Sequence, residues 1–283
     1  MADTFAPPPS NTPPRDAILG SLPSPLLGKS DAPAFEVYNP NGAASLLIIS
    51  DHASNALPLA LGDLGLSVDN FSKHIAYDIG ADMITRYLAD KVGASAVISN
   101  YSRLAIDMNR QPGDPQSIPE ISDGIKIPGN INLDPTGAQA RLDEIFSPYH
   151  DTIDSEITRL WNRDGKPPAL FSIHSFTPQM NGENRFWDIG VLWNRDPRMA
   201  VPLIENLNNW PGLHVGDNEP YSGRDLAYTI DRHGAAGGIA NCAVEIRQDH
   251  CASRDEASHW ADILADALNH ILSLPNLHTV TSY

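Results

Sequence analysis

The chain has 283 residues, with 35 acidic side chains against 19 basic ones and a formal net charge of −16. This balance argues against a broad nucleic-acid-binding face and against polybasic attachment to a membrane, because both depend on clustered lysine and arginine. Hydrophobic residues make up 41% of the chain, which is enough for a sizeable core. We therefore expect a globular protein with neither nucleic acid nor membrane as a partner.

The N-terminal region differs in composition from the rest. The first 40 residues contain nine of the 24 prolines, which interrupts helices and sheets. We expect residues 1–34 to form an extended arm and residues 35–283 to form one catalytic domain. The chain shows no signal peptide or membrane span and has only Cys242 and Cys251, so we expect a reducing, cytoplasmic location. Its composition does not indicate an oligomeric state.

Hydrophobic patterning beyond the arm predicts strands alternating with helices. The expected strands cover residues 44–50, 94–99, 104–107, 169–173, 187–193 and 240–246. The expected helices cover residues 73–92, 136–162, 199–207 and 256–274, and long loops cover 111–134 and 220–238. This order predicts a single-domain α/β fold, a three-layer sandwich around a mixed, largely parallel sheet.

Polar clusters follow three of the apolar strands. They are Asp51-His52, His174-Ser175 and the segment from Glu245 to Arg247. Ligands of α/β sheets bind beyond the carboxyl ends of the strands. We therefore expect these clusters to contribute to one site.

His52 and His174 are candidate metal ligands. Two imidazoles and one carboxylate, without a thiolate, are typical of a catalytic zinc site with an open position for water. Either histidine alone could equally be a hydrogen-bonded residue at a strand end. The acidic ligand is open among Asp51, Asp78 and Asp82, and the chain has no His-Glu-x-x-His string.

The segment 102–110 contains two arginines, one aspartate and one asparagine. If it is a strand, Arg103, Asp107 and Asn109 point to one side. Together with Arg110 they suit a carboxylate ligand, which arginine binds with two parallel hydrogen bonds. An internal ion pair between Arg103 and Asp107 is the alternative, and both interpretations can hold together.

Glu245 and Arg247 lie two residues apart on an apolar strand and should share a face. Glu245 could be a general base, since burial raises the pKa of a glutamate. The two could also form a structural pair. Tyr221 and His233 lie in the loop 220–238 and could close over substrate; a packed tyrosine and a surface histidine are the alternatives.

Other catalytic motifs are missing from the sequence. It contains no Gly-x-Ser-x-Gly string, no Gly-x-Gly-x-x-Gly string and no phosphate-binding P-loop string. Serine hydrolysis, dinucleotide binding and P-loop chemistry are therefore disfavoured.

At this point several strings resemble the N-formylglutamate amidohydrolase family, from about Phe35 to Ala267. The most specific is Ser-Arg-x-x-x-Asp-x-Asn-Arg. The strings are Ser50–Pro58, Tyr101–Arg110, Pro148–His150, Ser172–Phe176 and Pro220–Gly223.

The resemblance implies a zinc-carboxypeptidase-like fold, of the phosphorylase/hydrolase type, with one zinc ion. In such proteins a histidine, an acidic residue and a later His-Ser pair hold zinc, an Asn-Arg pair binds the substrate carboxylate, and a Glu-hydrophobic-Arg string supplies the base. The matching residues in chain order are His52, Asn109-Arg110, His174-Ser175 and Glu245-Ile246-Arg247. Comparison with the amidohydrolases selects Asp78 as the acidic ligand.

Two departures set this chain apart. Carboxypeptidase-type sites have His-x-x-Glu, whereas Asn55 stands three residues after His52. Histidine-utilisation members tend to have Pro-His-Ser-Gly where this chain has Asp51-His52-Ala53-Ser54-Asn55. The resemblance therefore places the chain on a divergent branch and supports amide hydrolysis better than it supports one substrate.

The sequence thus predicts a zinc-dependent amidohydrolase acting on a small anionic N-acyl amino acid such as N-formylglutamate. His52, Asp78 and His174 would hold zinc and Glu245 would be the catalytic base. The expected substrate-binding residues are Arg103, Asn109, Arg110, Arg247, Tyr221 and His233. The alternatives are a carboxypeptidase or cell-wall amidase acting on peptides, and a non-catalytic protein that binds acidic small molecules.

Overall fold

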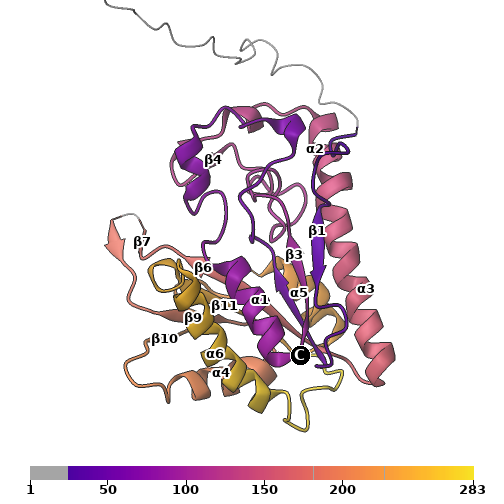
Figure 1. Ribbon diagram of the computed structural model, residues 1–283, viewed down its shortest axis with the longest axis vertical. Coiled ribbons are helices and arrows are strands. Elements are labelled where there is room, and N and C mark those ends of the chain that lie inside the picture. The colour runs from indigo at the N-terminus through magenta and orange to yellow at the C-terminus, as the bar shows by residue number, and fades with distance from the viewer. Residues whose placement is uncertain (1–24, 181, 226) are drawn as a thin grey trace, which may run out of the picture.

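The structure is a computed structural model that describes residues 25–180, 182–225 and 227–283. Its centre is a seven-stranded sheet with the order β1-β3-β2-β6-β11-β9-β10 (Figure 1). The strands are β1 (Phe35–Tyr38), β2 (Leu46–Ser50), β3 (Ser95–Ser99), β6 (Ala169–Phe176), β9 (Ile189–Leu192), β10 (Val215–Asp217) and β11 (Asn241–Arg247).

The sheet is mixed and largely parallel, as the sequence predicts. The pairs β3-β2, β2-β6, β6-β11 and β9-β10 are parallel, whereas β1-β3 and β11-β9 are antiparallel. Because β2, β6 and β11 are parallel neighbours, their carboxyl ends lie side by side at one edge. This edge receives all three polar clusters named above.

Helices cover both faces of the sheet and form the two outer layers of the sandwich (Figure 1). One face packs against α1 (Ala81–Val92), α4 (Pro197–Leu207) and α6 (Arg254–Ile271). The other packs against α3 (Ser147–Asp164) and the short α5 (Tyr228–His233). The helix α2 (Pro135–Arg141) runs through a π turn (Leu142–Phe146) into α3.

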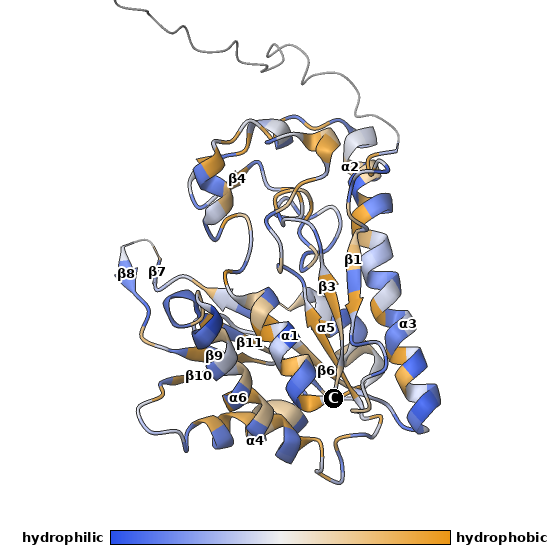
Figure 2. Cartoon of the chain, viewed as in Figure 1, coloured by the Kyte–Doolittle hydropathy of each residue, from blue (hydrophilic) through white to orange (hydrophobic). Residues whose placement is uncertain are grey.

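Alternation along the strands explains the two cores. In β2, Leu46 and Ile48 face α1, whereas Leu47 and Ile49 face the α3 side, and all four are fully buried. A strand buried on both faces is continuously apolar, and residues 46–49 are accordingly all leucine or isoleucine, with Ser50 at the end of the strand. Figure 2 shows hydrophobic residues along the central strands and hydrophilic ones on the outer turns of the helices.

Two small hairpins and several short turns project from this sandwich. The hairpins pair β4 (Ile121–Ser122) with β5 (Ile125–Lys126), and β7 (Gln179–Met180) with β8 (Glu183–Asn184). The 3₁₀ turns are Leu59–Leu61, Val68–Ser72, Pro128–Asn130, Ala235–Gly237 and Gln248–His250. The loop 111–134 therefore contains β4, β5 and one turn, and α5 lies inside the predicted loop 220–238.

Two expected elements are wrong. Residues 104–107 form turns instead of a strand, because the Ser102 hydroxyl accepts from the backbone N–H of Leu104 and the Asp107 carboxylate accepts from that of Asn109. The first helix begins at Ala81 and not at residue 73. Gly80 precedes it with a φ of 86° and packs against the backbone of Cys251.

The predicted arm lies mostly outside the described residues, since its residues 1–24 are not described. Of its remainder, Leu26 is buried, and the backbone N–H groups of Leu26 and Leu27 donate to the Glu144 carboxylate at 2.7 and 2.8 Å. Residues 25–34 thus contact the domain. A search of the described helices found none with the length and apolar character needed to span a membrane.

Candidate active site

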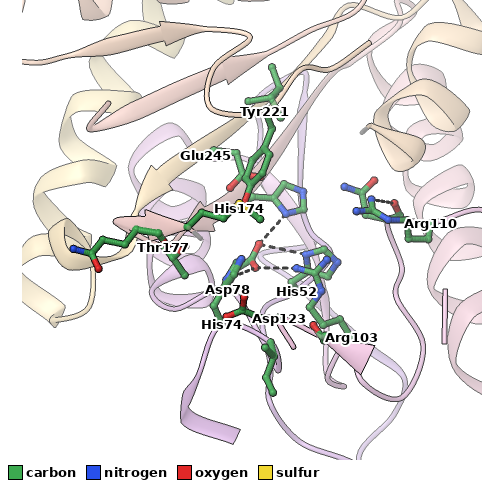
Figure 3. A pocket seen from close by; sticks show the side chains of 16 residues that line it. His52, His74, Asp78, Arg103, Arg110, Asp123, His174, Thr177, Tyr221 and Glu245 are labelled. Atoms are coloured by element: carbon green, nitrogen blue, oxygen red, sulfur yellow. Dashed lines mark hydrogen bonds and ion pairs between the residues drawn. The ribbon is translucent and has the colours of Figure 1, made fainter. Parts of the chain in front are cut away.

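Two histidines and one aspartate meet at the carboxyl edge of the sheet. His52 follows β2 directly, His174 lies near the end of β6, and Asp78 lies in the turns that precede α1. Oδ2 of Asp78 is 3.3 Å from Nδ1 of His52 and 2.9 Å from Nδ1 of His174. Figure 3 shows Asp78 between the two imidazoles. One ligand atom from each residue lies within 4.8 Å of the others, so this group could hold a metal ion.

The far nitrogen of His52 is held by the Asp107 carboxylate, and that of His174 by the Ser172 hydroxyl with Asp51 beside it. Nε2 of His52 is 2.8 Å from Oδ1 of Asp107, and Nε2 of His174 is 3.3 Å from Oδ2 of Asp51 and 3.0 Å from the Ser172 hydroxyl. A proton on each Nε2 leaves the Nδ1 lone pair facing Asp78. A hydrogen bond at the far nitrogen fixes the tautomer of a ligating imidazole, and a carboxylate partner such as Asp107 also raises its basicity.

The donor set fits zinc. Two imidazole nitrogens and one carboxylate suit a catalytic zinc with an open fourth position. Oδ1 of Asp78 is buried without a hydrogen-bond partner among the described residues, although a guanidinium nitrogen of Arg103 lies 3.5 Å away. The other oxygen, Oδ2, faces the Nδ1 atoms of both imidazoles, and a buried carboxylate oxygen shared by two imidazoles is the arrangement expected of a metal ligand.

Glu245 lies beside this group, in β11, where it is the register partner of His174 in β6. Both line a cavity of about 290 Å³. Burial raises the pKa of Glu245 to about 7, and His174 opposes part of that rise. A carboxylate with a raised pKa in a cavity is a candidate general base.

The 102–110 segment supplies the cationic side of the cavity. Arg110 and Asn109 both line it, and Figure 3 shows Arg110 set apart from the histidines. Oδ1 of Asn109 accepts from the backbone N–H of Thr229 at 3.0 Å, so its amide N–H groups remain as donors. Arg103 also lines the cavity and is paired with Asp107 at 2.7 Å, which is the internal ion pair left open above. The internal ion pair is thus present, and Arg103, Asn109 and Arg110 all line the cavity.

Tyr221 lies above Glu245 in Figure 3 and lines the same cavity. Its hydroxyl accepts from Arg185 at 2.8 Å, and the Arg185 guanidinium lies 4.7 Å from the centre of the ring. Residues of both hairpins, Asp123 and Gln179 among them, complete the rim.

Two predicted site residues lie elsewhere. His233 stacks on His150 with the ring centres 5.0 Å apart, and its Nδ1 is 2.6 Å from Asp154. Arg247 is hydrogen-bonded to Asp249 at 2.8 Å. Neither lines the cavity. His233 belongs to α5, which packs over the Met108 segment, and Arg247 is the last residue of β11, beyond the level of Glu245.

Sequence reasoning missed Tyr149 and His74, and it named Asp51 and Asp107 without placing them beside the histidines. Asp51 and Asp107 support the histidines, Tyr149 donates to Oδ1 of Asp51 at 2.8 Å, and His74 lines the cavity beside Asp78. Asp51 directly precedes His52 in the sequence, but its carboxylate lies beside His174 in the structure. Nothing in the local pattern around Tyr149 or His74 distinguishes them from core and loop residues.

The fold and the site define an α/β protein with a buried histidine–carboxylate centre at the carboxyl edge of its sheet. A family model described as N-formylglutamate amidohydrolase matches residues 44–252. The chain belongs to this family.

Relatives and solved structures agree with this assignment. The chain is 30% identical over 216 residues to an N-formylglutamate deformylase of Pseudomonas putida, a match that covers 68% of this chain and 75% of the relative. It is 32% identical to the structure of gene product Atu2144 from Agrobacterium tumefaciens, with a TM-score of 0.83 over 88% of this chain and 98% of the other. An N-formylglutamate amidohydrolase from Ralstonia eutropha shares the fold at 17% identity and a TM-score of 0.60, over 85% and 97% of the two chains.

Proposed function

We propose that this protein is a zinc-dependent amidohydrolase that cleaves the amide bond of a small N-acyl amino acid, with N-formylglutamate as the first candidate. The observation that carries the proposal is one cavity lined by His52, Asp78, His174 and Glu245 together with Asn109 and Arg110. Family membership supports hydrolysis of an amide, and the name of the Pseudomonas putida relative suggests the formyl group.

His52, Asp78 and His174 would hold the zinc ion. When bound, zinc supplies a Lewis acid that polarises the amide carbonyl and makes water more acidic. Glu245 takes the proton from the attacking water and gives it to the leaving nitrogen as the carbon–nitrogen bond breaks. The products are a carboxylic acid, which is formate for a formyl group, and the free amine.

The cationic side of the cavity would bind the carboxylate of the amino acid. Arg110 supplies a guanidinium and Asn109 supplies amide N–H groups, and such donors recognise a carboxylate with directional hydrogen bonds. Tyr221 and Arg103 would contact the rest of the substrate. Arg103 and Arg110 thus place positive charge at the cavity of a chain whose net charge is −16.

The two alternatives are less well supported. A volume of about 290 Å³ is that of a small-molecule cavity and not of a peptide-binding groove. A separation of His52 and His174 well beyond one coordination sphere would favour the non-catalytic alternative, whereas their ring centres are 5.1 Å from each other.

The test is a chelator-and-readdition assay on a panel of N-formyl and N-acetyl amino acids. We expect hydrolysis of at least one member, its loss after chelation, and its recovery with zinc. Glu245→Gln should retain zinc and lose nearly all turnover, whereas His174→Ala should lose stoichiometric zinc. Normal turnover by Glu245→Gln, or hydrolysis of none of the panel by the zinc-loaded protein, would contradict the proposal.

A further inference from the structure

A second, much smaller cavity lies behind the active site. Its volume is about 10 Å³, and it shares Asn109, His174, Leu192 and Glu245 with the main cavity. Measured as the space open to the centre of a water molecule, this is the volume that holds one water. The apolar walls, Leu192, Ala227, Ile230 and Ala243, leave no room for a second.

Two buried acceptors line this cavity without a hydrogen-bond partner among the described residues. They are Oδ2 of Asp51 and Oε2 of Glu245. Asp51 is 1% exposed, and its other oxygen accepts from Tyr149. His174 Nε2 lies 3.3 Å from Oδ2, but its hydrogen bond goes to Ser172. Buried carboxylate oxygens are almost always hydrogen-bonded in folded proteins, so a donor is required here.

Two donors also line the cavity. Oδ1 of Asn109 is occupied by the backbone N–H of Thr229, which leaves the Asn109 amide hydrogens as donors. Ser172 accepts from Nε2 of His174 when Nδ1 of that ring is the metal-facing atom, so the Ser172 hydroxyl hydrogen is also free to donate. The walls of the cavity thus supply two acceptors and two donors, which is the full hydrogen-bonding complement of one water molecule.

We propose that this cavity binds one water molecule, which links Oε2 of Glu245 to Oδ2 of Asp51 and so orients the Glu245 carboxylate toward the main cavity. The water is a fixed structural partner and is distinct from the water consumed in hydrolysis. Its role rests on the function proposed for Glu245. It makes Asp51 and Ser172 positioning residues that act through the bound water.

The direct test is a high-resolution crystal structure of the zinc-loaded protein. We expect one ordered water within about 3 Å of both Oε2 of Glu245 and Oδ2 of Asp51, the ordinary length of such a hydrogen bond. A well-ordered site without density at this position would overturn the proposal. The crystal structure does not depend on turnover, so it tests the water site even if the substrate proposal fails. Failure of the substrate proposal alone would appear as a wild-type protein that contains the water but hydrolyses no substrate.

Ala243→Val tests the role of the water. The two added methyl groups should displace it, because Ala243 is buried and lines the cavity. We expect the water density to disappear and kcat to fall about 10-fold to 100-fold, as for a small misplacement of a catalytic group. KM and zinc content should stay close to those of the wild type.

Ala96→Val is the matched control, since Ala96 is equally buried, in β3, and lines neither cavity. It should overpack the core without changing kcat. A wild-type kcat in an Ala243→Val protein whose crystal structure lacks the water would overturn the positioning role. If Ala243→Val does not fold, the wild-type crystal structure still decides the water site.

Discussion

Nε2 of His52 lies 2.8 Å from Oδ1 of Asp107, and the other oxygen of Asp107 is paired with Arg103 at 2.7 Å. Asp107 therefore connects a candidate zinc ligand to the half-buried guanidinium of Arg103. The Arg103 guanidinium also holds the pKa of Asp107 well below its usual range, against the effect of burial, so the carboxylate remains charged and accepts a hydrogen bond from the imidazole N–H.

Asp107→Asn should weaken zinc binding. The amide is a poorer acceptor than the carboxylate and leaves Arg103 without its charge partner, so the ring of His52 is less firmly held and less basic. Loss of such a partner costs about 10-fold to 100-fold in metal affinity. A competition titration against a chelator measures the change.

Asp82→Asn is the control for this substitution. Asp82 was one of the three candidate ligands in the sequence, but its carboxylate is hydrogen-bonded to Arg86 on α1 at 2.9 Å. We expect zinc affinity to stay at the wild-type value in this variant. Equal affinities in the wild type and Asp107→Asn would contradict a supporting role for Asp107.

Tyr149→Phe should destabilise the protein. Tyr149 is fully buried, and burial together with Asp51 raises the pKa of its hydroxyl well above the usual range, so it stays a donor. Its removal leaves Oδ1 of Asp51 buried without a donor, which costs about 1–3 kcal/mol in the free energy of unfolding. Urea denaturation measures this loss.

Tyr228→Phe provides the comparison. The Tyr228 hydroxyl accepts from Arg232 at 3.1 Å in an exposed pair, so its removal should change the free energy of unfolding by no more than about 0.5 kcal/mol. Similar losses in both variants would show that the Asp51 contact contributes nothing specific.

The histidine pair could be predicted from the sequence because it depends on local signals. His52 and His174 each follow an apolar run of strand length, and parallel strands place their carboxyl ends at one edge. That β2 and β6 are neighbours depends on the strand order, which no local pattern encodes. Asp78 could be selected only through the family resemblance, since its contact with both rings spans distant parts of the chain.

The periodicity rule placed Arg247 on the same face as Glu245, yet it does not line the cavity. A shared face is not a shared environment, because two residues along a strand shift a side chain by about 7 Å. At that position the acidic residues around it, Asp249 among them, bind the guanidinium instead.

The strand predicted at 104–107 is wrong for another reason. Leu104 and Ile106 are buried and alternate as strand residues do. The backbone conformation there is instead set by the Ser102 and Asp107 side chains, which accept hydrogen bonds from backbone N–H groups two residues further on.

Glu144→Ala should release the segment that enters the domain. The two carboxylate oxygens of Glu144 accept from the backbone N–H groups of Leu26 and Leu27. Without them, we expect faster amide hydrogen exchange at these two residues and a loss of about 1–2 kcal/mol in the free energy of unfolding. Asp143→Ala is the neighbouring control. Asp143 is exposed and its carboxylate accepts a hydrogen bond from the side-chain amide of Gln139, so exchange at residues 26 and 27 should not change. Unchanged exchange in Glu144→Ala would show that the buried side chain of Leu26 alone holds the segment.

Gly190→Ala should destabilise the sheet beside the active site. Gly190 is the register partner of Glu245, and a Cβ atom at this position would collide with the carbonyl oxygen of Glu219, two residues before Tyr221. Overpacking against backbone costs about 1–3 kcal/mol in the free energy of unfolding, and the displaced Glu219 should also move Tyr221 and raise KM. At Gly237 the nearest atoms to an added Cβ are 3.6 Å away in the Ile239 side chain, an ordinary contact, so Gly237→Ala should leave both quantities unchanged. Both substitutions add the same methyl group. Equal denaturation midpoints for the two variants would therefore mean that the Glu219 backbone can move away at no cost and that its close approach does not require glycine at position 190.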